Sequence, residues 1–255
     1  MAKVSIILGE MGTGKSYSMR NLPIDSTYII EVLATKELPF RGSDKWVSTR
    51  HLTFRSDYVS TLKEMRKISD KCPKIKTIVI DDAIYIMRNE YFNRAMEPGY
   101  GKYTELAQHF QMIIDECGRL RDDIRVFLVL HSESLTDENR TVIGYKASTI
   151  GKLLDSQYNP LECVTVVLYS DIQFDADGTA HYGFHTRKRK VGQVLLPCKS
   201  PAGMFPADFI DNDLKTVIEC MDKYYSSDDE EVQTPTEEEK PVIMRDPVDL
   251  NIFEL

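Results

Sequence analysis

The residues with the clearest chemistry form a glycine-rich segment near the N-terminus. Residues 9–16 read Gly-Glu-Met-Gly-Thr-Gly-Lys-Ser, a full match to the pattern GxxxxGK[ST]. In such a segment the glycines let the backbone wrap closely around phosphate groups, so that successive N–H groups point at their oxygens. Lys15 is then expected to reach the β- and γ-phosphates, and the Ser16 hydroxyl to be a ligand of Mg²⁺. The segment predicts a site for a nucleoside triphosphate with Mg²⁺, whose binding residues are Gly9, Glu10, Met11, Gly12, Thr13, Gly14, Lys15, Ser16 and Tyr17.

Two acidic residues follow a second strand-like segment. Residues 78–80 read Ile-Val-Ile, and Asp81 and Asp82 come directly after them. Ligands of open α/β sheets bind outside the carboxyl ends of the strands, and an aspartate in this place commonly holds Mg²⁺. We therefore predict that Asp81 is a metal ligand. Asp82 either orients the attacking water or caps the next turn.

Glu31 and His131 are also predicted to lie at strand ends. Glu31 comes near the end of the apolar segment 27–32, where a carboxylate could polarise a water opposite the leaving phosphate. The alternative for Glu31 is a surface acid. His131 follows segment 126–130, and it either senses the γ-phosphate through a hydrogen bond or is a structural histidine.

A dense basic cluster, Arg187-Lys188-Arg189-Lys190, comes late in the chain. It has three candidate roles. Arg187 and Arg189 could complete the catalytic site of a neighbouring subunit, the cluster could contact nucleic-acid phosphates regardless of sequence, or it could be a solvated strand end. Lys152 is a weaker candidate for the same work.

The elements that must position these residues follow from the apolar periodicity. Up to residue 133, strand-like and helix-like segments alternate, which favours an α/β fold with a mostly parallel central sheet flanked by helices. Two later strand-like segments are joined by Asp175-Ala176-Asp177-Gly178, which predicts a β-hairpin. The expected strands are 3–8, 27–32, 77–80, 126–130, 164–174 and 179–186, and the expected helices are 16–21, 57–69, 103–120 and 211–225.

The charge is unevenly distributed over the 255 residues. The chain has 32 basic and 40 acidic residues, and ten of the acidic but only two of the basic ones lie in 226–255. The tail therefore carries −8, and residues 1–225 carry 30 of each sign and are neutral. We predict a domain over 1–225 and a disordered acidic tail over 226–255. The apolar tip of this tail, Val248, Leu250, Ile252 and Phe253, is either a docking peptide for a protein partner or incidental in a solubilising tail.

Two absences bear on the class of protein. No apolar run reaches the roughly 18 residues that span a bilayer, so we expect no membrane association. The five cysteines lie far apart and form no CxxC pair, which favours a reduced, intracellular protein with buried thiols.

Together these motifs resemble those of phage-encoded ATPases of the AAA/RecA-like type, over roughly residues 3–215. The resemblance rests on GEMGTGKS, on the strand leading to Glu31 and on Leu-Pro-Phe-Arg-Gly at 38–42. It also rests on IVIDD, on VFLVLHSE and on the late hairpin running into TRKRK. It implies a RecA-like P-loop core, ATP with Mg²⁺, and a homo-oligomer with basic residues acting between subunits. It also implies an ATPase coupled to phage DNA recombination, annealing or replication, with single-stranded DNA as a partner, in the cytoplasm of an infected bacterial host.

Two other functions share the P-loop. A nucleotide kinase would need arginines that close over the phosphates, for which Arg119, Arg121 and Arg125 are the candidates. A nucleotide-gated adaptor would bind ATP to hold an assembled state, without significant hydrolysis.

Overall fold

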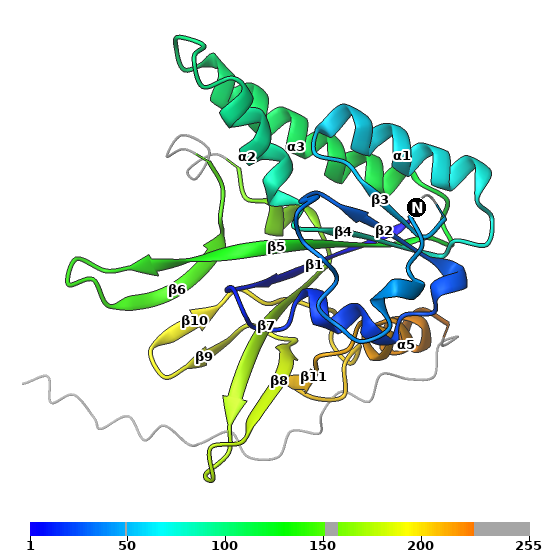
Figure 1. Ribbon diagram of the computed structural model, residues 1–255. Coiled ribbons are helices and arrows are strands. Elements are labelled where there is room, and N and C mark those ends of the chain that lie inside the picture. Colours follow the sequence, from blue (N-terminus) through cyan, green and yellow to red (C-terminus); the bar gives the residue numbers. More distant parts are fainter. Residues whose placement is uncertain (49, 151–157, 227–255) are drawn as a thin grey trace, which may run out of the picture.

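A single mixed β-sheet forms the centre of the protein in the computed structural model, which describes residues 1–48, 50–150 and 158–226 (Figure 1). Its main path has the strand order β11-β8-β7-β1-β5-β4-β2-β3. Lys152 and the acidic tail with its apolar tip lie outside the described residues.

Six strands of this path run parallel to their neighbours, which confirms the expected α/β class with a mostly parallel sheet. Antiparallel pairing adds β8 to β7 and β11 to β8 at one edge. The predicted late hairpin is thus confirmed, with Gly178 in its turn at a φ of 84°. The strands are β1 (Lys3–Gly9), β2 (Thr27–Glu31), β3 (Leu52–Phe54), β4 (Thr77–Asp81), β5 (Arg125–Thr136), β7 (Val166–Phe174), β8 (Ala180–His185) and β11 (Phe209–Asp211).

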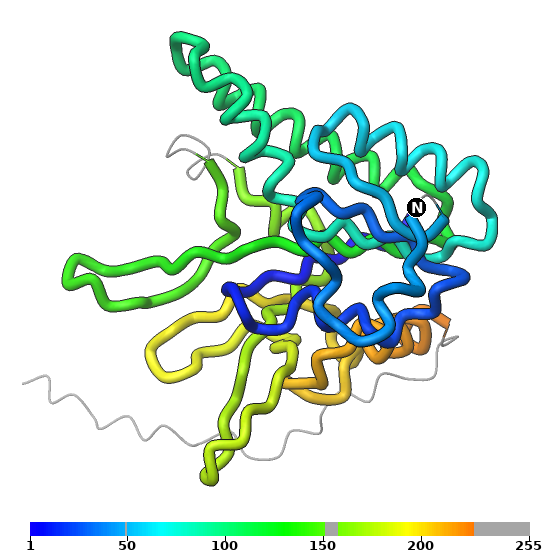
Figure 2. The backbone as a smooth tube through the Cα atoms, in the orientation of Figure 1, coloured from blue at the N-terminus to red at the C-terminus, as the bar shows by residue number. Residues whose placement is uncertain are grey.

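The sheet is buried on both faces, since helices cover each side. Successive side chains of each strand point to opposite sides and so enter different cores. Ile6 and Ile78 belong to one apolar core, whereas their neighbours Ile7 and Val79 belong to the other. The first core is covered by α1 (Tyr58–Lys71), α2 (Ile84–Asn93) and α3 (Gly101–Arg119). The second is covered by the 3₁₀ helix η1 (Ser16–Asn21) and by α5 (Leu214–Ser226), as the backbone trace in Figure 2 also shows.

The strand that carries His131 differs most from expectation. The apolar run of β5 ends at Leu130, but the strand continues to Thr136 because its polar second half pairs with antiparallel β6 (Val142–Ala147). Two further short strands, β9 (Arg189–Val191) and β10 (Val194–Leu196), extend β6 into a small sheet beside the main one (Figure 1). These polar or short segments, like β3, β11 and α2, lack the apolar periodicity that predicts an element.

The structure bears on two expectations from the sequence, the lack of a membrane-spanning segment and the burial of the cysteine thiols. Within the described residues, no helix is both long and apolar enough to cross a bilayer. All five cysteines are free, but only Cys117 and Cys198 are buried and Cys163 is exposed, so the expectation of buried thiols was partly wrong.

Strand β11 packs closely against β8 at Gly183. A Cβ atom at Gly183 would lie 2.3 Å from Cζ of Phe209 and 2.6 Å from the carbonyl oxygen of Ile210, so the backbone of β11 would have to move. We expect Gly183→Ala to lower the free energy of unfolding by about 1–3 kcal/mol, which urea denaturation would measure.

The matched control is Gly101→Ala at the start of α3, where no atom outside the adjacent residues and the backbone of the helix itself lies within 4 Å of the added Cβ. This variant should unfold at the same urea concentration as the original chain or at a slightly higher one. Equal stability of the two variants would contradict the close packing of β11 on β8.

Candidate functional site

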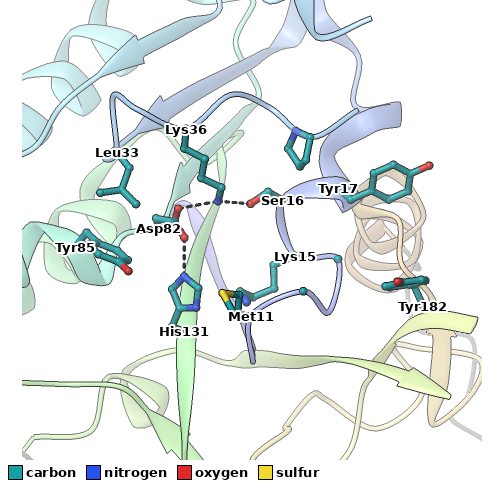
Figure 3. A pocket seen from close by; sticks show the side chains of 13 residues that line it. Met11, Lys15, Ser16, Tyr17, Leu33, Lys36, Asp82, Tyr85, His131 and Tyr182 are labelled. Carbon is teal, nitrogen blue, oxygen red and sulfur yellow. Dashed lines mark hydrogen bonds and ion pairs between the residues drawn. The ribbon is translucent and has the colours of Figure 1, made fainter. Parts of the chain in front are cut away.

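Many of the predicted site residues meet at the carboxyl edge of the parallel strands. Since β1, β2, β4 and β5 are parallel, the loops after β1, β2 and β4 leave the sheet at the same edge, beside His131 of β5. There they surround a cavity of about 730 Å³. Its walls are Met11, Gly12, Gly14, Lys15, Ser16, Tyr17, Leu33, Lys36, Pro39, Asp82, Tyr85, His131 and Tyr182 (Figure 3).

The glycine-rich loop forms one wall of this cavity. Gly14 has a φ of 90° and Lys15 is right-handed, and such an alternation makes a concave row of N–H groups suited to an anion. Ser170 on β7 donates a hydrogen bond of 2.6 Å to the carbonyl oxygen of Thr13 and so fixes the loop from behind. Of the nine predicted binding residues, six line the cavity, whereas Gly9, Glu10 and Thr13 do not.

The helix after the loop has the predicted bounds, but it is a 3₁₀ helix. Residues 16–21 form a six-residue 3₁₀ helix, which aligns few peptide dipoles toward the cavity. The attraction of this wall for an anion therefore depends on the N–H groups of the loop and on Lys15 rather than on a helix dipole.

Lys15 is folded back onto its own loop. Its ammonium donates to the carbonyl oxygens of Gly9 at 2.9 Å and Glu10 at 2.5 Å. Burial lowers the pKa of Lys15 to about 8, although the negative charges of Asp82 and Asp81 partly oppose this shift. An anion in the cavity would offer the ammonium a stronger partner than neutral carbonyl oxygens.

Ser16 and Asp81 are brought together as the sequence predicts for a metal site. The Ser16 hydroxyl donates to Oδ2 of Asp81 at 2.7 Å, and Asp81 is fully buried. Burial raises the pKa of Asp81, while Lys36 opposes the shift. The second carboxylate oxygen, Oδ1, is buried and has no hydrogen-bond partner among the described residues.

Lys36, which the sequence analysis did not single out, reaches this pair from the loop after β2. Its ammonium donates to Ser16 Oγ at 2.8 Å and to Asp82 Oδ2 at 2.7 Å (Figure 3). It also donates to Asp81 Oδ2 at 3.2 Å. Burial disfavours the charged amine, but the two carboxylates outweigh it and raise the pKa of Lys36.

Asp82 and His131 form a second contact within the cavity. Nε2 of His131 lies 3.0 Å from Oδ1 of Asp82, and β5 places His131 beside Gly9 in the strand register. Burial opposes ionisation of Asp82, but hydrogen bonds from His131 and Lys36 outweigh it and hold its pKa below the usual value. Asp82 also has a φ of 56°, a left-handed conformation that costs a non-glycine residue about 1 kcal/mol or more and is common at functional sites.

Glu31 lies behind the site. It is the direct register partner of Asp81, is 1% exposed, and does not line the cavity. Burial, together with the negative charge of Asp81, raises the pKa of Glu31 to about 8. The alternative of a surface acid is therefore wrong.

The basic cluster is separate from the cavity. Arg187 donates to the carbonyl oxygen of Phe205 at 3.2 Å and pairs with Asp208 at 3.5 Å. Arg189 is exposed on β9, and neither arginine lines the cavity.

The arginines considered for a kinase lid lie elsewhere. Arg125 begins β5 beside Lys3, at the opposite edge of the sheet from the glycine-rich loop, and pairs with Asp222. Arg121 is held by carbonyl oxygens, including that of Ile75 at 2.8 Å. Arg121 and Arg125 therefore do not lie where they could close over a phosphate in this cavity.

Several wall residues have only a weak signal in the sequence. Leu33, Lys36 and Pro39 follow β2, and the rule that ligands bind beyond the carboxyl ends of strands points to this loop without naming its residues. Tyr85 and Tyr182 come from α2 and from β8, and no motif marks either tyrosine.

Comparisons with known proteins give no evidence on function, so that evidence comes from the geometry of the site. No protein-family model matches the chain, and no curated protein is significantly similar to it in sequence.

The buried carboxyl group of Glu31 predicts a specific dependence of stability on pH. Its folded pKa of about 8 lies above its ordinary value of 4.5, so between these values the folded chain keeps a proton that the unfolded chain releases. Glu31 therefore contributes stability at low pH that is lost as the pH rises toward 8. Glu31→Gln removes this loss, so we expect it to gain stability relative to the original chain between pH 5 and pH 8.

Urea denaturation at pH values across this window would measure the effect. Glu138→Gln, at an exposed position, controls for the loss of one acid from the chain. The same pH dependence in all three proteins would show that Glu31 is not held neutral in the fold.

Proposed function

We propose that this chain is a P-loop NTPase with a RecA-like core, which binds ATP with Mg²⁺ and hydrolyses it. The observation that carries the proposal is the convergence of Lys15, Ser16 and Asp82 around one cavity, with the buried Asp81 hydrogen-bonded to Ser16. The cavity volume of about 730 Å³ lies within the range of small-molecule and cofactor sites.

The two ends of the cavity suit the two ends of a nucleotide. Lys15, Ser16 and Asp82 surround the end where the phosphates would lie. Tyr17 and Tyr182 lie away from Asp82 and His131 (Figure 3), and their rings offer apolar faces against which a base could stack. In this arrangement Lys15 leaves the carbonyl oxygens of its own loop and binds the β- and γ-phosphates.

The residues present fit a magnesium ion. Among the described residues, no group of three or more His, Cys, Asp or Glu side chains could hold a metal. Mg²⁺, however, is usually bound through one or two carboxylates together with waters and substrate phosphates. Ser16 and Asp81 would hold it, and the unpartnered Oδ1 of Asp81 is an available ligand. When bound, Mg²⁺ would neutralise negative charge on the phosphates.

Asp82 is the better candidate for orienting the attacking water. It lines the cavity, and its lowered pKa keeps it ionised at neutral pH, so it can accept a hydrogen bond from water. Glu31 lies behind Asp81, and a pKa of about 8 leaves it mostly protonated at pH 7. His131 would hold Asp82 in position through Oδ1.

The basic cluster supports the part of the proposal that concerns oligomers and DNA. Arg189 and Lys190 are exposed on β9, in one of the hairpins that extend from the main sheet (Figure 1). Since they do not line the cavity of their own chain, they could complete the site only in a second copy. The same charges suit phosphates of single-stranded DNA. Coupling to phage DNA recombination, annealing or replication, in the cytoplasm of an infected host, rests on the resemblance of the motifs.

The proposed function predicts ATP hydrolysis that depends on Lys15. The rate per subunit should rise with protein concentration and with single-stranded DNA. Lys15→Ala should lower the rate by about 100-fold or more, because it removes the positive charge that stabilises the negative charge developing on the phosphates in the transition state. Release of inorganic phosphate, measured at several protein concentrations with and without DNA, tests all three expectations.

Lys45→Ala is the matched control, because Lys45 is an exposed lysine that does not line the cavity. A rate independent of both protein concentration and DNA would contradict the oligomeric, DNA-coupled function. Tight ATP binding with no turnover would instead support the nucleotide-gated adaptor.

A further inference from the structure

The ammonium group of Lys36 occupies the centre of the predicted metal position. It lies 2.8 Å from Ser16 Oγ, 3.2 Å from Asp81 Oδ2 and 2.7 Å from Asp82 Oδ2. Ser16 and Asp81 are the residues that would hold Mg²⁺, and Ser16 already donates to the same oxygen of Asp81 that Lys36 contacts. The proposed hydrolysis assigns no role to Lys36.

A lysine ammonium and a magnesium ion compete for such a position. The ammonium is a compact charge with three donors, and here it meets three oxygens. Mg²⁺ prefers the same hydroxyl and carboxylate oxygens at about 2.0–2.1 Å. An ion bound to Ser16 and Asp81 at these distances would overlap the ammonium, so the two cations cannot be present together.

The ammonium of Lys36 leaves one oxygen of the buried Asp81 carboxylate without a hydrogen-bond partner. Asp81 is 0% exposed, yet its Oδ1 atom is buried with no hydrogen-bond partner among the described residues, whereas Oδ2 accepts from both Ser16 and Lys36. A buried carboxylate oxygen without a partner is costly. A divalent ion, with twice the charge and more ligand positions, could use both oxygens.

The chain around Lys36 allows the ammonium to leave without unfolding the loop. Leu38 and Phe40, two and four residues further on, are buried in the core that also holds Trp46. The backbone is therefore anchored. The Lys36 side chain itself is 34% exposed and lines the cavity, so rotation of its flexible stem can carry the charge toward the space where phosphates would lie.

We propose that Lys36 is a tethered cation, which holds the magnesium position of the nucleotide-free protein and competes with Mg²⁺ for Ser16 and Asp81. The inference rests on the proposed function, because that function defines the magnesium position. Its consequence is that the metal alone binds weakly. The metal and the triphosphate bind well together, because the phosphates accept the displaced ammonium.

The experiment measures binding of Mn²⁺, which takes oxygen ligands like those of Mg²⁺, to metal-stripped protein without nucleotide. Electron paramagnetic resonance counts the free ion. Lys36→Met removes the competing charge, so we expect it to bind Mn²⁺ more tightly than the original chain, by on the order of tenfold. Lys45→Met, which removes an exposed lysine from the same loop, should bind Mn²⁺ as the original chain does.

Thermal unfolding provides a second readout that does not depend on activity. Without metal, Lys36→Met leaves Asp81 and Asp82 without their cation, so its unfolding midpoint should fall below that of Lys45→Met. Added Mg²⁺ should raise the midpoint of Lys36→Met more than that of the original chain, because only in this variant is the position open. Lys36→Gln, which keeps a hydrogen-bond donor without the charge, serves if Lys36→Met does not fold.

Equal or weaker Mn²⁺ binding by Lys36→Met and Lys36→Gln would overturn the proposal. The absence of Mn²⁺ binding in all variants would overturn it as well, because the oxygens would then form no cation site. The proposed function is tested separately by ATP binding in excess chelator, where the original chain should bind and Lys15→Ala should not. Failure of that comparison would overturn the proposed function, whatever the Mn²⁺ result.

Discussion

The buried carboxylate of Asp81 is the constraint on which the rest of the site depends. A carboxylate that is fully removed from water needs hydrogen bonds and a compensating cation. Here Ser16 and Lys36 supply them from the loops after β1 and β2, while Asp81 itself ends β4. One buried charge thus ties together three segments that are distant in the sequence, and the cavity is the space that they leave open at the edge of the sheet.

The surroundings of that carboxylate give the neighbouring acids different protonation states. Glu31 and Asp82 are both adjacent to Asp81, one in the strand register and one along the chain. Glu31 is buried without a cation of its own and is held neutral, whereas Asp82 faces the cavity and receives hydrogen bonds from His131 and Lys36. Burial opposes ionisation of both acids, so the difference comes from the hydrogen bonds that His131 and Lys36 make with Asp82.

The architecture separates the cavity from the hairpins that extend from the main sheet. The helices cover both faces of the sheet and leave its carboxyl edge open, and the cavity occupies that edge. The paired strands β5 and β6, β7 and β8, and β9 and β10 extend from the main sheet (Figure 1). Because β5 carries His131 in its middle and pairs with β6 in its second half, one strand connects the cavity wall to an extended hairpin.

The sequence by itself determined the local features of this protein. The spacing of residues 9–16 identified the loop, and the apolar runs identified the main parallel strands and three of the larger helices. The sequence also placed Asp81 and Asp82 at a strand end. These features are readable because turn chemistry and side-chain periodicity act over a few residues. Only the tertiary structure decided that Lys36 reaches the Ser16–Asp81 pair, that Glu31 is buried behind it, and that His131 meets Asp82. The same is true of the arginines at the far edge, such as Arg125. These outcomes depend on the order of the strands in the sheet and on the path of the loop that carries Lys36, which has no apolar periodicity. A local sequence pattern encodes neither, because the contacts join residues that are tens of positions apart.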